Sequence, residues 1–434
     1  GRETWSDLPA GREDDMGQNG TTPKGPRCIA LVGPFQSGKT TLLEAILART
    51  GAVPRQGTVD GGTSVGDASK EARAHKMSVE ATFASVNFMG ESYTFVDCPG
   101  SIEFLHDMRT VLPAVDAAVV VCEADEKKVP QLQLILRELE EQNIPRFLFL
   151  NKIDKADKRV RETIKLLQPA SRAPLLLRQI PIWKGDLIAG FVDLALERAF
   201  VYNEYAASEI VDLAGEDLSR EKEARFTMLE TLADHDDALM EQLLDDIQPP
   251  RDKVFDDLAK ELRDRIVCPV LLGCAMRSNG VLRLLKALRH EAPGVAETAE
   301  RLGVKPSAEA VALVLKTFHT THGGKMSVAR VLTGQIGDGT TLSTPDGEAG
   351  RVSGVLKPMG QQFEKRGAAG AGDTVALGKL DGVKTGATLS TGKQPHPALA
   401  DVKPSPPVLA IAVQARERKD DVKLGVAFTK LTEE

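Results

Sequence analysis

One stretch of the chain, from Cys28 to Leu47, constrains the fold more than any other: CIALVGPFQSGKTTLLEAIL. It begins with an apolar run, Ile29–Val32, which is typical of a buried strand. The next eight residues, Gly33–Thr40, match the pattern G-x-x-x-x-G-K-[ST], and leucine and isoleucine then recur at helical spacing. Because a strand, a glycine-rich loop and a helix follow in this order, the stretch predicts a loop whose backbone amides bind a polyphosphate.

The residues of this loop have distinct expected roles. Gly33 and Gly38 let the backbone turn its amides toward the phosphates because they carry no Cβ. We expect Lys39 to reach the β- and γ-phosphates and the hydroxyl of Thr40 to bind Mg²⁺. The alternative, a chance glycine turn before a helix, is disfavoured because strand and helix are both in place. Further nucleotide contacts are expected from three neighbouring residues: Gln36, Ser37 and Thr41.

A second motif stands at the end of the strand expected at Tyr93–Val96. There the sequence continues Asp97-Cys98-Pro99-Gly100, a D-x-x-G. We expect Asp97 to contact Mg²⁺ through water, and the amide of Gly100 to bind the γ-phosphate and release it after hydrolysis. The motif is weak by itself, but its place after a phosphate loop and at a strand end makes it specific.

A third motif follows the buried strand expected at Phe147–Leu150. It reads Asn151-Lys152-Ile153-Asp154, an N-K-x-D. The carboxylate of Asp154 can accept hydrogen bonds from N1 and N2 of guanine, which adenine does not offer, with Asn151 and Lys152 beside the base. A later strand, at 268–272, ends in three small residues expected to face guanine O6: Gly273, Cys274 and Ala275. The three motifs in this order predict a GTP-binding site.

Residues 51–76 are rich in glycine, serine and charge and show no sustained period, which predicts a long loop beside the phosphates. In a GTPase this place belongs to the first switch. Ser78, at the end of the loop, carries a hydroxyl where such switches contact Mg²⁺ from the γ-phosphate side. The alternative is an ordinary surface serine. Strands are expected at 80–88 and 91–96, joined by a turn at Met89-Gly90.

Composition narrows the class of protein. The chain has 434 residues, enough for about three domains, and 42% of them are hydrophobic. No apolar run approaches the ~20 residues of a membrane span. The net charge of −7 argues against general polyanion binding, and 4% aromatic residues argue against a stacking surface for single strands. Five cysteines without a C-x-x-C pair favour buried thiols in a reducing cytoplasm.

The pattern of elements predicts how the chain divides into domains. The first 26 residues are expected to form a disordered leader. An α/β P-loop GTPase domain is expected at 27–157 and 263–295, interrupted by an inserted α/β subdomain at 158–262. Short strands with glycine turns predict a β-barrel at 306–396. Residues 407–434, with a strand at 408–413 and a helix from 420, are expected to begin an α+β domain that is truncated.

Several elements are expected inside these boundaries. Helices with apolar stripes alternate with buried strands in the GTPase domain, and acidic helices follow two strands in the insertion. The expected helices are 102–112, 130–142, 221–244, 253–265 and 280–291, and the expected strands between them are 117–121, 180–183 and 187–194.

From Arg27 to Glu434 the chain resembles the translational GTPases, and most closely the bacterial elongation factor G family. The resemblance rests on GPFQSGKTT, DCPG, NKID and GCA, on the insertion before GCA, and on the run from Pro407 to Leu431. It implies GTP as substrate, GDP as product and Mg²⁺ as cofactor. It also implies a cytoplasmic monomer that works on the ribosome through local contacts with ribosomal RNA.

Three departures from the family pattern bear on catalysis. The histidine that follows D-x-x-G in the family is Ser101 here. The family's R-G-I-T is replaced here by His75–Ser78, and the family's H-I-D-A in the phosphate loop is replaced by Pro34–Ser37. The resemblance therefore implies that Lys39, Gly100 and Ser101 are the catalytic residues, with Ser101 in place of the family's histidine.

Three functions stay open at this point. The first is a translation factor that hydrolyses GTP on the ribosome, in translocation or ribosome recycling. The second is a GTP-binding regulatory switch with little or no hydrolysis, which Ser101 keeps open. The third is a GTPase similar to the class-II release factor.

Overall fold

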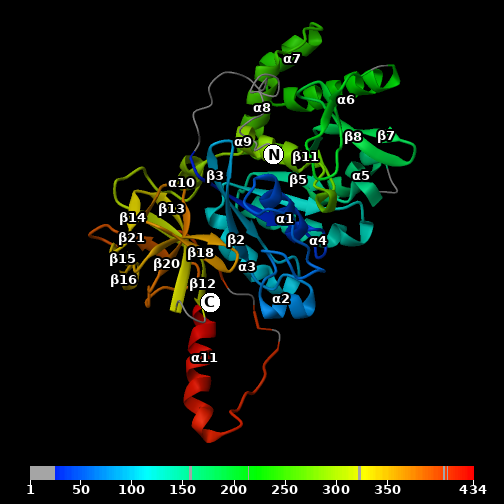
Figure 1. Cartoon of the computed structure of the whole chain (residues 1–434). Coiled ribbons are helices and arrows are strands. Elements are labelled where there is room, and N and C mark those ends of the chain that lie inside the picture. The colour runs from blue at the N-terminus through cyan, green and yellow to red at the C-terminus, as the bar shows by residue number, and fades with distance from the viewer. Residues whose placement is uncertain (1–24, 156–158, 214, 321–323, 404–405, 408) are drawn as a thin grey trace, which may run out of the picture.

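The computed structural model describes residues 25–155, 159–213, 215–320, 324–403, 406–407 and 409–434. The predicted leader lies outside these residues apart from Gly25 and Pro26. Figure 1 shows an α/β domain at the centre, an insertion above it, a strand-rich domain beside it and a C-terminal helix below. The α/β domain, the insertion and the strand-rich domain follow one another as expected from the sequence.

The nucleotide-binding domain is built on strands in the order β2-β3-β1-β4-β5-β11-β6. β2 runs antiparallel to β3, and the other neighbours are parallel. β1 and β4 are buried along their whole length, as expected for parallel strands covered on both faces. The strands are β1 (Arg27–Val32), β2 (Thr82–Phe88), β3 (Glu91–Asp97), β4 (Ala117–Cys122), β5 (Arg146–Leu150), β6 (Leu175–Leu177) and β11 (Cys268–Leu272).

Helices cover both faces of this sheet. On one face α1 (Lys39–Arg49) and α9 (Val281–Glu291) share an apolar core with the strands. On the other face the core includes residues of α3 (Leu105–Val111), α4 (Val129–Glu141) and α5 (Val160–Leu167). The remaining helices here are α2 (Lys70–His75) and α10 (Val295–Arg301), with 3₁₀ turns η1 (Ile102–Phe104), η2 (Leu112–Ala114), η3 (Glu126–Lys128), η4 (Ile153–Lys155), η5 (Gln168–Ala170) and η6 (Ala275–Arg277).

Two local expectations differ from the structure. The helix expected over 102–112 consists of a 3₁₀ turn, α3 and a second 3₁₀ turn, in which Pro113 cannot donate a helical hydrogen bond. The loop expected at 51–76 contains the short helix α2. Its first turn is capped by Ser69, whose hydroxyl accepts a hydrogen bond from the amide of Ala72.

The insertion combines an antiparallel sheet, β10-β9-β8-β7, with three helices that share its apolar core. The helix expected at 221–244 is two helices, because Asp236 caps the second one by accepting from the amide of Leu239. β6 pairs with β11, so we propose that the insertion begins after β6 and not at residue 158. Its elements are β7 (Gln179–Lys184), β8 (Leu187–Asp193), β9 (Arg198–Val201), β10 (Glu209–Val211), α6 (Glu216–Ala233), α7 (Asp237–Leu244) and α8 (Arg251–Arg263).

The strand-rich domain follows α10 and has an apolar core of its own. Most of its strands pair antiparallel along one path, which continues into the nucleotide-binding domain. Its strands are β12 (Val311–Thr320), β13 (Gly324–Thr333), β14 (Gln335–Gly337), β15 (Thr341–Thr344), β16 (Gly347–Arg351), β17 (Val355–Met359), β18 (Gln362–Arg366), β19 (Ala368–Gly370), β20 (Thr374–Gly378) and β21 (Thr388–Ser390).

Direct contacts join the strand-rich domain to the nucleotide-binding domain. The amide of Gly360 donates a 2.8 Å hydrogen bond to the carbonyl of Phe83 on β2. A fully buried ion pair joins Arg330 of β13 to Asp116, which directly precedes β4, at 2.7 Å. Breaking such a pair leaves a buried charge without a partner, so it holds the two domains in one arrangement.

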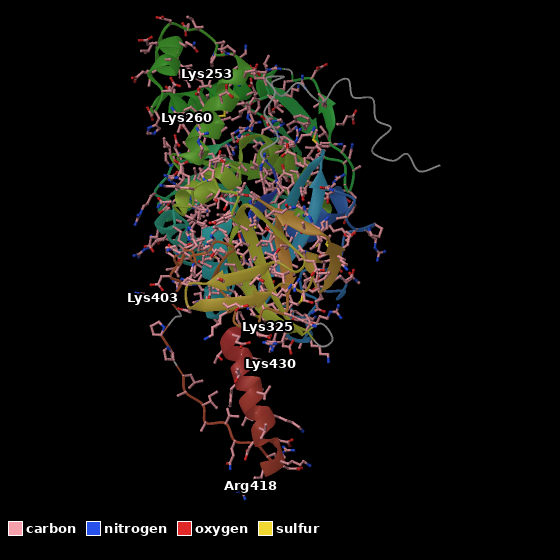
Figure 2. The ribbon with its side chains drawn as sticks, turned by 90° about the vertical axis from the view of Figure 1, so that its left-hand side faces the viewer. Lys253, Lys260, Lys325, Lys403, Arg418 and Lys430 are labelled. Carbon is pink, nitrogen blue, oxygen red and sulfur yellow. The ribbon has the colours of Figure 1, made fainter. Side chains whose placement is uncertain are left out.

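The C-terminal segment differs from the sequence-based expectation. The strand expected at 408–413 is absent: Val408 lies outside the described residues, and 409–413 form no strand. Leu409 and Ile411 are both 74% exposed, because no described strand lies beside them to complete a sheet. The segment then forms η7 (Arg418–Asp420) and α11 (Asp421–Glu433), and Figure 2 shows Arg418 and Lys430 on the part that projects below the body.

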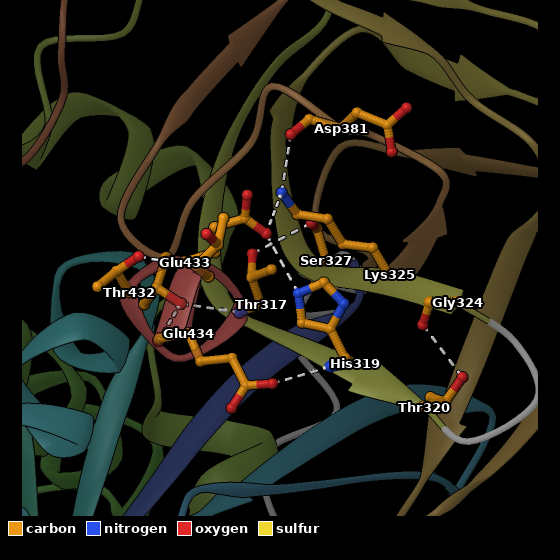
Figure 3. Close-up of polar contacts among 12 residues, drawn as sticks. Thr317, His319, Thr320, Gly324, Lys325, Ser327, Asp381, Thr432, Glu433 and Glu434 are labelled. Carbon is orange, nitrogen blue, oxygen red and sulfur yellow. Dashed lines mark hydrogen bonds and ion pairs between the residues drawn. The ribbon is translucent and has the colours of Figure 1, made fainter. Parts of the chain in front are cut away.

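The end of α11 contacts the strand-rich domain. Glu433 lies 3.0 Å from the amine of Lys325 and 3.1 Å from the ring of His319 (Figure 3). These bonds hold the end of the helix, while its apolar side chains Val422 and Val426 stay exposed. In the described part of the chain, no helix has the length and apolar character that crossing a membrane requires.

Candidate nucleotide-binding site

The phosphate loop joins β1 to α1 and adopts a backbone that suits glycine at two positions. Gly33 has φ +148°, and a Cβ there would clash with the carbonyl of Val121 and lie 3.0 Å from the Ser37 hydroxyl. Gly38 has φ +96°, and its missing Cβ leaves room for the amide of Asn151. Gln36 also has a positive φ, +58°. The loop is thus tightly shaped, with Thr41 following in the first turn of α1.

Lys39 lies buried at the start of α1, with 5% of its surface exposed. Its amine donates a 3.1 Å hydrogen bond to the carbonyl of Pro34. Burial lowers the pKa of Lys39, and the nearby charge of Asp97 opposes this shift. A Cβ on Gly100 would clash with the Lys39 amine and lie 2.9 Å from the carbonyl of Gly33, so Gly100 packs directly on the loop.

Oxygen atoms from three segments meet beside Lys39. The Thr40 hydroxyl donates to the carboxylate of Asp97 at 2.6 Å, and the hydroxyls of Thr40 and Ser78 are 3.1 Å apart. The second carboxylate oxygen of Asp97 is buried without a described partner. Burial raises the pKa of Asp97 to about 7, with the charge of Lys39 opposing the shift. We call these residues, with Gly100, the phosphate end of the site.

Asp67 belongs to this group, although the sequence analysis did not single it out. Its side chain is 5% exposed, and burial raises its pKa, opposed by hydrogen bonds with Ser78 and Thr40 and by the charge of Lys39. Within the loop 51–76 no pattern distinguishes Asp67 from Asp60. Only the folded position of the loop identifies it.

Glu44 is a second residue that the sequence analysis missed. It lies on α1, is 1% exposed, and accepts hydrogen bonds from the amides of Val65 at 2.7 Å and Gly66 at 3.1 Å. Burial raises the pKa of its carboxyl, and these backbone bonds lower it. Glu44 thus fixes the switch loop on α1. A signal was present, since a charged residue stands here within an otherwise apolar stretch of helix.

The residues of the third motif lie at the other end of the loop. The Asn151 side chain donates to the carbonyl of Ser37 at 2.9 Å and accepts from the amide of Ala275 at 2.9 Å. The amine of Lys152 donates to the carbonyl of Gln36 at 2.7 Å. Asn151 therefore joins the phosphate loop to the loop after β11.

Asp154 and the loop after β11 complete what we call the base end of the site. One carboxylate oxygen of Asp154 lies 3.5 Å from the guanidinium of Arg277, and the other is buried without a described partner. A Cβ at Gly273 would lie 2.6 Å from the carbonyl of Asn279. Burial raises the pKa of Cys274 to about 11, so its thiol stays protonated at neutral pH. The base end therefore offers Asp154 as an acceptor beside small residues.

Ser101 is placed outside these hydrogen-bonded groups. Its hydroxyl donates to the exposed carboxylate of Glu103, two residues further along the chain. The structure therefore brings Thr40 into hydrogen-bond distance of Ser78 and Asp97, with the charge of Lys39 acting on Asp97, whereas the side chain of Ser101 bonds elsewhere.

A glycine-rich phosphate loop, a D-x-x-G and an N-K-x-D, each at the end of a parallel strand of one sheet, define a P-loop GTPase domain. A family model described as the elongation factor Tu GTP binding domain matches residues 24–294. An elongation factor G-like protein from Synechocystis is 39% identical over 419 residues, which are 96% of this chain and 61% of that protein. One of the same name from Mycobacterium tuberculosis is 30% identical, with 95% and 61% covered.

A solved structure from Thermus thermophilus superposes with a TM-score of 0.84 at 27% identity, covering 95% of this chain and 61% of that one. The chain therefore belongs to the family defined by the elongation factor Tu GTP binding domain, and along 96% of its length it is similar to an elongation factor G-like protein. It spans 61% of the length of both named relatives.

Proposed function

We propose that the protein binds GTP and GDP and hydrolyses GTP as a translation factor of the elongation factor G type. One observation carries the proposal: the second and the third motif both form hydrogen bonds with the phosphate loop. Asn151 and Lys152 donate to the carbonyls of Ser37 and Gln36, and Asp97 accepts from Thr40. A site joined in this way can hold base and phosphates at once.

Residues of the phosphate loop would bind the phosphates through their amides, with Gly33 and Gly38 shaping the backbone. The amine of Lys39 would exchange its bond to Pro34 for one to the β- and γ-phosphates, where it stabilises charge that develops during hydrolysis. Asp154 would accept from guanine N1 and N2, and Gly273, Cys274 and Ala275 would face O6.

The residues at the phosphate end fit Mg²⁺, the cofactor that the family implies. Mg²⁺ prefers oxygen ligands, and here the hydroxyls of Thr40 and Ser78 lie beside a buried carboxylate oxygen of Asp97 without a partner. When bound, the ion would neutralise charge on the β- and γ-phosphates. Thr40 and Ser78 would hold it directly and Asp97 through water.

We expect hydrolysis to be slow without the ribosome. An attacking water must be held about 3 Å from the γ-phosphate and in line with it. The serine at 101 is shorter than the family's histidine, and its hydroxyl is already bonded to Glu103. The same bond favours the second candidate, a GTP-binding switch with little or no hydrolysis.

The family also suggests the partner. We propose that the protein acts as a cytoplasmic monomer on the ribosome, through local contacts with ribosomal RNA, in a translocation or recycling type of step. No described feature favours the third candidate, a release-factor-like GTPase.

GTP turnover with and without ribosomes tests the proposal. We expect GDP binding in both cases, slow turnover alone, and at least tenfold faster turnover with ribosomes. Binding without turnover in either condition would support the regulatory switch. If neither GTP nor GDP binds to the folded protein, the proposal is wrong in both forms.

A further inference from the structure

Gln131, in the first turns of α4, is bonded on both sides to the nucleotide site. Its side-chain oxygen accepts a 3.1 Å hydrogen bond from the amide of Phe35 in the phosphate loop. Its side-chain nitrogen donates to the carbonyl of Gly100 in the D-x-x-G. One amide group therefore joins the phosphate loop to the glycine that is expected to bind the γ-phosphate.

The position of Gly100 shows what the hydrogen bond from Gln131 can affect. A Cβ on Gly100 would clash with the Lys39 amine and lie 2.9 Å from the carbonyl of Gly33 and 3.0 Å from that of Pro34. Gly100 thus packs on the end of the loop where Lys39 would otherwise receive a γ-phosphate. A γ-phosphate bound to Lys39 would therefore meet Gly100, whose backbone would have to move outward to admit it.

The helix that carries Gln131 is held firmly in the domain. Leu132, Ile135 and Leu136 of α4 are buried in the core. Just before the helix, Lys128 pairs with Glu123, which also lies 2.9 Å from the amine of Lys152. Gln131 is therefore fixed to the scaffold, whereas Gly100 lies in the loop that follows β3.

We propose that Gln131 is a positioning residue that holds Gly100 against Lys39 and so sets the preference of the site between GDP and GTP. The inference rests on the proposed function, since it requires that guanine nucleotides bind. It concerns the γ-phosphate alone, because GDP has none and leaves Gly100 where it lies. The same site thus acquires a residue, outside all three motifs, that opposes GTP selectively.

The size of the effect follows from a two-state argument. A ligand that binds only the open arrangement has an apparent affinity proportional to the fraction of protein that is open, and this fraction is small when the closed arrangement predominates. Removing one hydrogen bond of ordinary strength from the closed arrangement shifts the equilibrium about three- to tenfold. The expected gain in affinity for GTP is therefore about three- to tenfold, and the expected change for GDP is none.

Replacing Gln131 by leucine tests the inference, and Gln133→Leu provides a matched control on the exposed side of the same helix. The measurements are equilibrium affinities for fluorescent GDP and for a fluorescent GTP analogue that resists hydrolysis. For Gln131→Leu we expect the ratio of GTP to GDP affinity to rise about three- to tenfold, and for Gln133→Leu to stay constant. Thermal unfolding checks that each variant folds, and Gln131→Met replaces a variant that does not.

Two outcomes would overturn the inference while leaving the proposed function intact. One is an unchanged ratio in Gln131→Leu, and the other is an equal change in both affinities, which would indicate a purely structural role. Failure of the unmodified protein to bind either nucleotide would instead refute the proposed function.

Discussion

At the base end, Asn151 bonds to the backbone on both of its sides, whereas at the phosphate end Thr40 and Ser78 bond to each other through side chains. The base end uses loops that directly follow β5 and β11, so their positions are set by paired strands. The phosphate end depends on the segment 51–78, which reaches the site only through contacts such as Glu44 with Val65.

The two ends therefore differ in what holds them. At the base end, one carboxylate, that of Asp154, has a buried oxygen without a described partner, whereas at the phosphate end two carboxylates, those of Asp67 and Asp97, each have one. A buried carboxylate oxygen without a partner is costly, and an arriving cation or donor relieves that cost. We infer that the base end is formed in advance and that the phosphate end changes with its ligand.

The largest expected effect is a loss of GDP affinity when the base end is altered. Asp154→Asn removes an acceptor of two hydrogen bonds to guanine, and each charge-assisted bond contributes about 1.5–3 kcal/mol. We expect GDP affinity to fall about 10³-fold. The variant should instead bind xanthosine diphosphate, whose C2 oxygen accepts where guanine donates. Competition with a fluorescent nucleotide measures both affinities.

Xanthosine nucleotide also serves as the control for folding, because a variant that binds it tightly has an intact site. ATP provides the second control, and it should not displace GDP from the unmodified protein. If ATP displaced GDP at comparable concentration, Asp154 would not select the base, and the base end would have lost its assigned role.

The next effect concerns the chemistry at the phosphate end. Ser101→His restores an imidazole that can reach a water near the γ-phosphate, and one positioned group of this kind commonly contributes ~10²–10³ in rate. We expect single-turnover hydrolysis to rise about 10²-fold with ribosomes while GDP affinity stays constant. Rapid-quench measurements of the unmodified protein and the variant, each alone and with ribosomes, provide the comparison.

Ser101→Ala is the matched control, since it removes the hydroxyl that bonds to Glu103 and adds no imidazole. Its rate should stay close to that of the unmodified protein. Fast hydrolysis by the unmodified protein with ribosomes, with no gain from the histidine, would mean that Ser101 does not mark an attenuated GTPase.

What the sequence could predict follows the same division between the two ends. Gly33–Thr40 and Asn151–Asp154 each lie within a few residues of a buried strand, so pattern alone placed them. Asp67, Glu44 and Gln131 contribute through contacts with residues far along the chain. The charge of Glu44 within an apolar stretch of helix is a local signal, but it does not identify the partners of Glu44, and no local pattern marks Asp67 or Gln131.

The fold shows the same limit. The order of domains could be predicted because each has its own periodicity, from helical stripes to short alternating strands. The pairing of β6 with β11 could not be predicted, since three residues carry too little pattern. The prediction of a strand at 408–413 was wrong for the opposite reason. The apolar residues Leu409 and Ile411 alternate along the chain as in a strand, but a strand also needs a neighbouring strand to pair with.

The smallest expected effect is a change in nucleotide affinity on substitution of Ser78, which tests whether the phosphate end distinguishes GTP from GDP. Its hydroxyl lies 3.1 Å from that of Thr40, and we expect it to act only when a γ-phosphate and Mg²⁺ are bound. Ser78→Ala should lower affinity for a GTP analogue with Mg²⁺ about three- to tenfold, the contribution of one ordinary hydrogen bond, and leave GDP affinity constant. Ser78→Thr keeps the hydroxyl and should keep both affinities. If alanine lowered both affinities equally, or neither, Ser78 would be an ordinary serine and the phosphate end would not distinguish the two nucleotides through it.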